Sequence, residues 1–160
     1  HRVDRRQRQM CIRDRIANGG YKIKPSFNAN DQFLFGEKII QDDDHLKLIK
    51  DSLNVATNEW RGTSYRSRLK GDLKYCGKTG TSQVRKITQE QRDLNIKNKD
   101  LPWKYRDHSL FTGYGPVSNP EYAVSVIIDH GGSGSSKAAP ISKKIMRKVF
   151  ELYYQKEKNV

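Results

Sequence analysis

Residues 109–129 read SLFTGYGPVSNPEYAVSVIID, and this stretch decides the expected fold. It contains two mostly apolar runs, 109–115 and 122–129, on either side of a turn rich in proline and asparagine. Alternate residues of the second run share one face of a strand: Tyr122, Val124, Val126 and Ile128. Two strands joined by so short a turn predict an antiparallel hairpin.

The segments on either side of this hairpin add a strand and a helix. Residues 73–84 have a strand pattern, and a long polar connection, 85–107, separates them from the hairpin. After a Gly/Ser stretch at 131–136, a helix is predicted over residues 138–154. Its apolar stripe is expected to pack on the strands: Ile141, Ile145, Val149 and Tyr153, widened by Met146 and Phe150.

A second helix is predicted before the strands, over residues 42–59. Its apolar residues fall on one stripe: Leu46, Ile49, Leu53 and Ala56. Asp42, Asp43 and Asp44 stand at its N-terminal end, where the helix dipole favours negative charge. Strands grouped together with packed helices indicate an α+β fold, in which an antiparallel sheet carries the C-terminal helix.

The first fifteen residues differ in character from the rest of the chain. Residues 1–15 are rich in arginine and glutamine without an apolar period, whereas 16–20 read as the end of a buried helix with a glycine stop. We therefore expect residues 1–15 to be a non-native or disordered segment that makes few contacts. Residues 16–160 are expected to form the structured part.

Composition limits the classes of function. The net charge of +13 would suit a nucleic-acid partner, but the charge is spread along the chain and no aromatic stacking pattern accompanies it. The spacing of Cys11 and Cys76 matches no disulfide framework or metal site. The longest apolar run, 123–128, is far shorter than the roughly 20 residues that cross a bilayer. We expect no nucleic-acid partner, no metal and no cofactor.

The string Lys78-Thr79-Gly80-Thr81 lies within the predicted first strand. Lys-Thr-Gly is one of three sequence elements of serine acyltransferases that act on penicillin-like substrates. By itself the string also fits an ordinary exposed strand, so the flanking sequence has to decide its meaning. Strict alternation places Lys78 on the opposite face from Thr79 and Thr81.

The flanks resemble the penicillin-binding transpeptidase family from Ile16 almost to the C-terminus. The segments that carry the resemblance occur in the family's order: ANGG (17–20), KP (24–25), RGT (61–63), CGKTGTSQV (76–84), RDHSLFTGY (106–114), NPEYAVSV (119–126), DHGGSG (129–134) and AAP (138–140). They are most similar to the elongation-specific class of the family, penicillin-binding protein 2. The resemblance implies that residues 16–160 are the C-terminal part of a transpeptidase domain.

The resemblance also implies a role for each residue of the motif. In the family a serine attacks the carbonyl between two terminal D-alanines of a peptidoglycan stem peptide, and the acyl-enzyme is resolved into a cross-link. Lys78 would tune the proton relay and attract the terminal carboxylate of the substrate. The hydroxyls of Thr79 and Thr81 would bind that carboxylate, and the Thr81 N–H would form half of the oxyanion hole. Gly80 would leave room for the acyl chain, and Ser82 would complete the binding strand.

The family's Ser-x-x-Lys and Ser-x-Asn elements do not lie in their expected place in this sequence. Both should precede Ile16, so we expect a chain that is truncated on that side and inactive alone. The resemblance further implies β-lactams as ligands, membrane proteins of the elongation complex as partners, and an inner-membrane anchor outside the chain with the domain on the periplasmic face.

Two other interpretations of the function stay open. A β-lactamase or a D-Ala-D-Ala carboxypeptidase of the same superfamily would need a positioned deacylating water, for which the sequence shows no residue. A basic binding module would bind DNA in a salt-dependent way and would not react with penicillin.

Several smaller patterns have simpler explanations. The Gly/Ser stretch 131–136 lacks the ending of a phosphate-binding P-loop and is interpreted as a turn. His108 and His130 each follow an aspartate, but neighbours on a strand point to opposite faces. Cys76 is interpreted as a small packed residue. Trp103 and Tyr114 are candidates to line a substrate groove.

Overall fold

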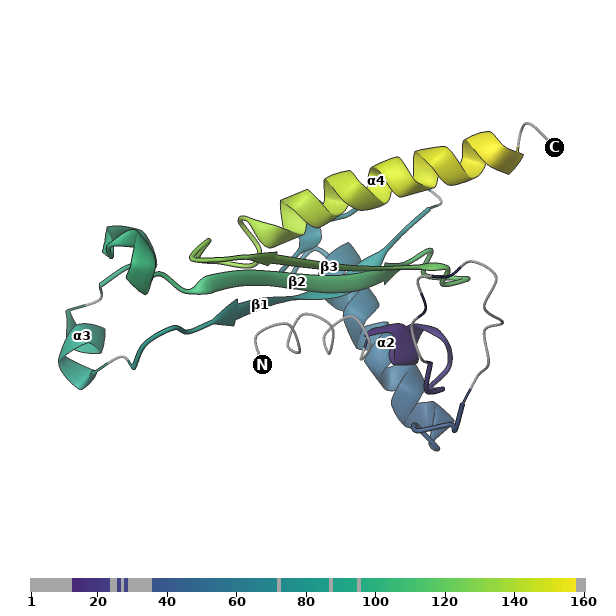
Figure 1. Ribbon diagram of the computed structural model, residues 1–160, viewed down its shortest axis with the longest axis horizontal. Coiled ribbons are helices and arrows are strands. Elements are labelled where there is room, and N and C mark those ends of the chain that lie inside the picture. Colours follow the sequence, from purple (N-terminus) through teal and green to yellow (C-terminus); the bar gives the residue numbers. More distant parts are fainter. Residues whose placement is uncertain are drawn as a thin grey trace.

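The computed structural model describes residues 13–23, 26, 28, 36–71, 73–86, 88–94 and 96–157, without the side chains of 91, 92 and 153–157. Its labelled elements are, in chain order, α2 (Asp43–Asn58), η1 (Tyr65–Ser67), β1 (Cys76–Ser82), α3 (Gln89–Asp93), η2 (Asn98–Asp100), η3 (Trp103–Tyr105), β2 (His108–Gly115), β3 (Tyr122–Ile128) and α4 (Ala138–Glu157). The strands form one antiparallel sheet with α4 beside it, which confirms the predicted α+β class (Figure 1).

The strand order is β1-β2-β3, and the predicted hairpin is β2 with β3. Strand β1 pairs with β2 from Cys76 opposite Tyr114 to Ser82 opposite His108. Strand β1 is shorter than the predicted 73–84, because the residues before Cys76 bond outside the ladder. The Lys74 carbonyl, for example, accepts a hydrogen bond from the Val117 N–H at 2.9 Å.

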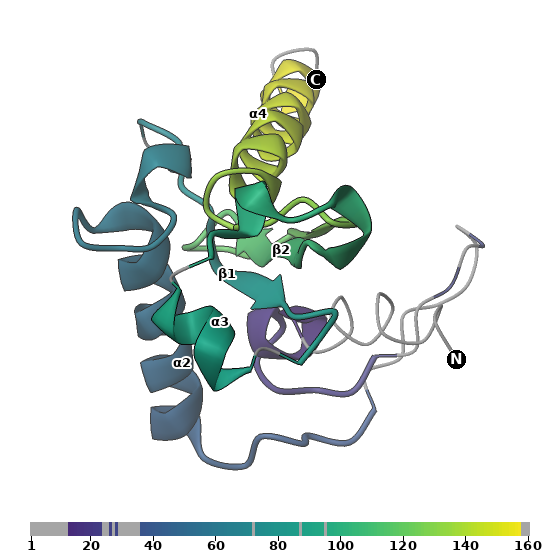
Figure 2. The ribbon, with the colours of Figure 1, turned by 90° about the vertical axis from the view of Figure 1, so that its left-hand side faces the viewer.

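The two faces of the sheet carry separate cores. On one face Phe111, Val124 and Val126 pack with residues of α4. On the opposite face Tyr114 and Cys76 pack with Leu53 of α2. Both views of the ribbon show this arrangement, with α4 on one side of the strands and α2 on the other (Figures 1 and 2). Because antiparallel partners share a face, each strand alternates between the two cores.

Helix α4 presents only part of the predicted stripe to the sheet: Met146 and Phe150 are buried and Val149 packs against the same core, as predicted, while the side chain of Tyr153 lies outside the described residues. Ile141 and Ile145 are 41% and 44% exposed, so their predicted packing on the strands is wrong. The buried residues of the helix are Ala138, Ala139, Ser142, Met146 and Phe150. The small residues allow the first turn to approach the sheet closely, and Met146 and Phe150 fill the core further along. The resulting helix rotation places the two isoleucines on its flank.

A pair of glycines lets β1 and β2 approach beneath an aromatic ring. Gly77 and Gly113 are directly opposite in the ladder. A Cβ on Gly77 would lie 2.4 Å from the Thr112 carbonyl oxygen and 2.6 Å from Cζ of Phe111. A Cβ on Gly113 would lie 2.4 Å from the Cys76 carbonyl oxygen. The Phe111 ring, which is fully buried, therefore occupies the space that side chains would need at this pair.

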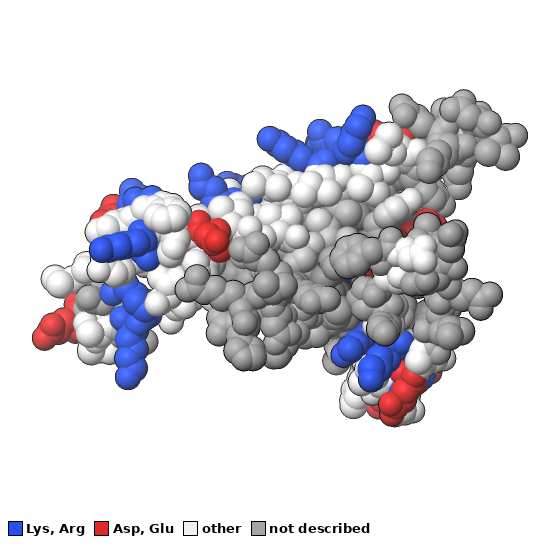
Figure 3. Space-filling view, viewed as in Figure 1, with Lys and Arg blue, Asp and Glu red and all other residues white. Residues whose placement is uncertain are grey.

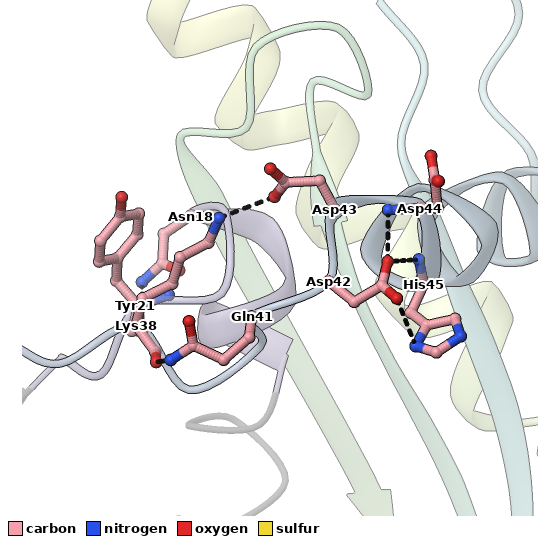
Figure 4. Close-up of polar contacts among 8 residues, drawn as sticks. All are labelled: Asn18, Tyr21, Lys38, Gln41, Asp42, Asp43, Asp44 and His45. Atoms are coloured by element: carbon pink, nitrogen blue, oxygen red, sulfur yellow. Dashed lines mark hydrogen bonds and ion pairs between the residues drawn. The ribbon is translucent and has the colours of Figure 1, made fainter.

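The start of α2 is capped by the first of its three aspartates, which lie at the predicted end of the helix. The Asp42 carboxylate accepts hydrogen bonds from the N–H groups of Asp44 and His45, at 2.9 and 3.0 Å (Figure 4). These bonds satisfy two of the N–H groups that a helix leaves without partners in its first turn. Lys38 forms an ion pair of 2.8 Å with Asp43, so the preceding segment is tied to the same end of the helix.

The buried side of α2 differs in part from the predicted stripe. Leu46 and Leu53 are buried as predicted, but Ile49 is 38% exposed, and the helix buries the polar Thr57 completely. Thr57 is buried because the end of the helix lies against the outer edge of β1, to which its hydroxyl is hydrogen-bonded.

The polar connection before β2 contains short helices, α3, η2 and η3, and projects beyond the strands (Figure 1). Side chains of this connection form hydrogen bonds with other residues of the same connection. Arg106 donates from Nε to the Leu101 carbonyl at 2.8 Å, and Asn98 exchanges hydrogen bonds with the side chain and the N–H of Asp107. Much of the connection is therefore folded.

Most of the N-terminal segment lies outside the described residues, so its predicted non-native character stays a prediction. Residues 13–17 are helical, and Arg13 is 7% exposed. In the part of the chain that the structure describes, the helices are too short or too polar to cross a membrane.

Candidate active site

The Lys-Thr-Gly motif lies on β1, at the edge of the described sheet. Lys78 and Thr81 are exposed, whereas Thr79, Gly80 and Ser82 are half-buried. On its inner side β1 is paired with β2 along its whole length. The motif therefore lies where a further extended peptide could pair with the outer side of β1.

Thr57 shows which backbone groups of β1 point outward. Its hydroxyl accepts a hydrogen bond of 3.0 Å from the Gly77 N–H and donates one of 3.1 Å to the Gly77 carbonyl. Both backbone groups of Gly77 are thus directed away from β2. In an antiparallel ladder this direction recurs at every second residue. The N–H and C=O groups of Thr79 and Thr81 are therefore directed outward as well, beyond the point at which Thr57 closes the edge.

Lys78 and Thr79 meet at this outer edge although they start from opposite faces of the strand. The Lys78 Nζ donates to the Thr79 carbonyl oxygen at 3.0 Å and lies 3.4 Å from the Thr79 Oγ1. An edge strand permits this contact, because no neighbouring strand lies between the two side chains. The sequence pattern alone assigned them to separate faces.

Thr63 joins this group from the turn that follows α2. The Thr79 hydroxyl donates a hydrogen bond of 3.2 Å to the Thr63 Oγ1. Sequence reasoning assigned no role to Thr63, although the RGT string at 61–63 was among the segments that resemble the family. Its position depends on the angle at which α2 meets β1, which no local pattern reveals.

Gly80 has open space on its side-chain face. A Cβ there would have one close neighbour, the Leu110 Cβ at 3.4 Å, which is an ordinary contact. The opposite side of the Gly80 backbone is covered, because a Cβ on Gly134 would lie 2.5 Å from the Gly80 carbonyl oxygen. The turn before α4 thus supports the motif strand from behind.

The Ser82 end of β1 adjoins a cluster of aromatic rings. His108, the ladder partner of Ser82, accepts a hydrogen bond of 2.9 Å at Nδ1 from the His130 N–H. The rings of Trp103 and His130 meet edge to face, with centroids 4.4 Å apart. Trp103 is 63% exposed and stays a candidate groove residue, but Tyr114 is 1% exposed and is part of the core.

The two histidines do not form triads with the aspartates beside them in the sequence. Asp107 bonds with Asn98, while the His130 Nδ1 lies 2.8 Å from the Arg106 carbonyl oxygen. Among the described residues no three His, Cys, Asp or Glu side chains are grouped as they would be around a metal ion. The histidines tie the polar connection to the turn after β3.

Ser67 and Lys70 have the spacing of a Ser-x-x-Lys element but not its setting. Ser67 is 2% exposed, and its carbonyl accepts a hydrogen bond of 2.8 Å from the buried Tyr75 hydroxyl. A serine so enclosed cannot reach a substrate at the edge of β1.

A cleft of about 550 Å³ lies between α4 and the segment before β1, away from the motif. Its lining combines basic and apolar side chains, with one glutamate: Arg68, Leu69, Lys70, Leu73, Lys143, Arg147, Phe150 and Glu151. On the face drawn in Figure 3, Lys and Arg side chains form separate groups over α4, over the polar connection and near the start of α2. Among the residues coloured by charge on this face, these groups do not join into one basic band.

Cys76 precedes the motif on the opposite face from the α4 core and is fully buried. Burial raises the pKa of its thiol to about 11, and this effect outweighs the opposing hydrogen bond with Tyr114. The thiol is therefore protonated at neutral pH. Because the thiolate is the reactive form, Cys76 is not a nucleophile here.

We expect Cys76 to resist iodoacetamide at pH 8 in the folded protein and to react fully in guanidinium chloride. The measurement is mass spectrometry of the peptide that contains Cys76, which separates it from Cys11. Rapid alkylation of that peptide in the folded protein would contradict the buried, protonated state.

Comparison with known proteins agrees with this geometry. The sequence model of the penicillin binding protein transpeptidase domain matches residues 7–147. The chain belongs to this transpeptidase family.

Several curated relatives carry the name peptidoglycan D,D-transpeptidase MrdA. The protein from Salmonella typhimurium is 32% identical over 104 residues, which are 65% of this chain and 16% of that protein. The protein from Haemophilus influenzae is 34% identical over 97 residues, or 61% of this chain and 14% of that protein. This transpeptidase chain thus matches about a sixth of the length of these relatives.

Solved structures confirm the likeness to penicillin-binding protein 2. In the complex between penicillin-binding protein 2 and MreC from Helicobacter pylori, the penicillin-binding protein is 25% identical to this transpeptidase chain and superposes with a TM-score of 0.74. The match covers 91% of this chain and 24% of the solved chain.

Proposed function

We propose that this chain supplies the substrate-binding strand of a peptidoglycan D,D-transpeptidase of the elongation-specific class. The observation that carries the proposal is the outer edge of β1. There Thr81, an exposed residue, has its N–H and C=O directed away from β2. An edge that offers both groups can hold an extended stem peptide as an added strand.

Lys78, Thr79 and Thr81 act on the substrate at this edge. The nucleophile is the serine of the family's Ser-x-x-Lys element, contributed by a segment other than those described here. The Thr81 N–H donates to the carbonyl oxygen as negative charge develops on it, which stabilises the transition state more than the ground state. Lys78 and the Thr81 hydroxyl bind the terminal carboxylate, and the Thr79 carbonyl accepts a hydrogen bond that orients the Lys78 ammonium. Gly80 and Ser82 border the acyl chain.

The reaction is an acyl transfer in two steps. The serine oxygen forms an ester with the carbonyl carbon of the penultimate D-alanine, and the bond to the terminal D-alanine breaks. The proton that the serine hydroxyl loses is transferred to the amine of the leaving D-alanine. The amine of a neighbouring stem peptide then attacks this ester, forms the cross-link and returns a proton to the serine. β-Lactams enter the first step and remain as the ester.

Cellular setting follows from the same proposal. We place the domain on the periplasmic face of the inner membrane, with its anchor in a segment outside this chain, and we propose membrane proteins of the elongation complex as partners. The solved complex of a penicillin-binding protein 2 with MreC supports a partner of this kind.

The test is covalent labelling of a transpeptidase domain in which this chain is joined to the family's Ser-x-x-Lys and Ser-x-Asn segments. We expect a fluorescent penicillin to label one serine of the Ser-x-x-Lys element, and a stem pentapeptide to release D-alanine. The isolated chain should not be labelled. A folded domain that neither reacts with penicillin nor releases D-alanine would sink the proposal, and rapid hydrolysis of the penicillin ester would favour a β-lactamase instead.

A further inference from the structure

The hydroxyl groups at the motif do not all have a proton available for a ligand. A threonine hydroxyl donates one hydrogen bond and accepts two. The Thr79 proton is directed to the Thr63 Oγ1, at 3.2 Å. The Thr79 oxygen lies 3.4 Å from the Lys78 ammonium, which can only donate. With these partners, Thr79 has no proton left for a carboxylate.

Thr63 is the next donor along the same chain of hydrogen bonds. Its oxygen accepts from Thr79, so its own proton is directed elsewhere, and its side chain is exposed beside the outer edge of β1. The polarity therefore runs from the Lys78 ammonium through Thr79 to Thr63. A chain of this kind polarises its last hydroxyl, because each donor strengthens the next.

The turn that carries Thr63 is held firmly in place. The Ser64 N–H and hydroxyl both donate to the Ala56 carbonyl, at 3.0 and 2.9 Å. The Ser64 Oγ also lies 3.2 Å from the Thr57 hydroxyl that caps Gly77. A Cβ on Gly62 would lie 2.4 Å from the Ala56 carbonyl oxygen, so glycine permits the tight approach. These contacts fix the position of Thr63 relative to the β1 strand that carries the motif.

We propose that Thr63 is a further substrate-binding residue, whose hydroxyl donates to the terminal carboxylate of the stem peptide or to the carboxylate of a β-lactam. This inference rests on the proposed function and adds a ligand to its carboxylate site. The carboxylate is then bound by two elements, the β1 strand and the turn after α2.

The test compares ligands with and without the carboxylate charge. In the complete transpeptidase domain, Thr63→Val removes the hydroxyl and keeps the shape. We expect its acylation rate constant with benzylpenicillin to fall about tenfold, as for loss of a hydrogen bond to a charged group. With benzylpenicillin methyl ester, which has no carboxylate, the rate should fall by no more than about two- to threefold, the lower end of the net value of a neutral hydrogen bond. Thr63→Ser should restore the reaction with benzylpenicillin.

Ser64→Ala is the matched control. It removes the neighbouring buried hydroxyl, which supports the turn but does not face the ligand, and its acylation should change by the same factor with both penicillins. If Thr63→Val also slowed both penicillins equally, or slowed neither, Thr63 would not be a carboxylate ligand. A wild-type domain that fails to react with benzylpenicillin would contradict the proposed function itself, so the two failures can be told apart.

Discussion

Replacing Lys78 with alanine in the complete transpeptidase domain is expected to slow acylation by penicillin about 100-fold or more. The Lys78 ammonium lies at the outer edge of β1, 3.0 Å from the Thr79 carbonyl oxygen, where a substrate carboxylate and a developing oxyanion would meet its charge. Loss of one preorganised donor or charge of this kind raises a barrier by about 3 kcal/mol. The measurement is the second-order rate constant for labelling by a fluorescent penicillin.

The fold should not depend on this lysine. Lys78 is exposed, and such substitutions usually change the free energy of unfolding by less than about 0.5 kcal/mol. Lys70→Ala, which removes another exposed lysine away from the motif, is the control and should keep the wild-type labelling rate. Unchanged labelling of Lys78→Ala, with its circular dichroism also unchanged, would remove the central assignment of the proposed site.

Replacing Gly77 with alanine is expected to destabilise the protein by about 3 kcal/mol or more. The added methyl group would meet the Thr112 carbonyl oxygen at 2.4 Å and the Gly113 Cα at 2.8 Å, and backbone cannot move aside cheaply. It would also displace the Phe111 ring, which is fully buried in the α4 core. Overpacking usually costs about 1–3 kcal/mol, and a clash with the backbone of a central ladder belongs at the upper end. Urea unfolding measures the difference.

Gly80→Ala separates this effect from a general cost of removing glycine from a strand. Its Cβ would make one ordinary contact, at 3.4 Å from the Leu110 Cβ, so the midpoint of unfolding should stay close to that of the wild type. Equal destabilisation by the two substitutions would show that the close approach at Gly77 is not what makes glycine necessary there.

Much of the sheet could be predicted because its signals are local. The alternation from Tyr122 to Ile128 and the proline-rich turn before it define the hairpin without reference to the rest of the chain. The aspartates likewise predict the N-terminal end of α2, which Asp42 caps in the structure. Features of this kind depend on neighbours within a few positions.

Features that depend on contact between distant segments could not be predicted in this way. Both apolar stripes suited helix packing in isolation, yet the close approach of Ala138 and Ser142 to the sheet rotates α4 and exposes Ile141. The role of Thr57 depends on a hydrogen bond to Gly77, 20 residues further along the chain. For the same reason the motif was recognisable from its string, whereas Thr63 required the meeting of α2 with β1.

The cap that Thr57 places on Gly77 also bears on how the protein behaves at high concentration. An uncovered strand edge invites a second copy of the chain to pair with it and to begin an aggregate. Here the hydroxyl of Thr57 occupies both outward groups of Gly77, and the charged Lys78 follows directly. Pairing between two copies is therefore restricted to the part of the edge that follows Lys78. The cap on Gly77 thus shortens the edge that a second copy could use, while the outward groups of Thr79 and Thr81 stay beyond it.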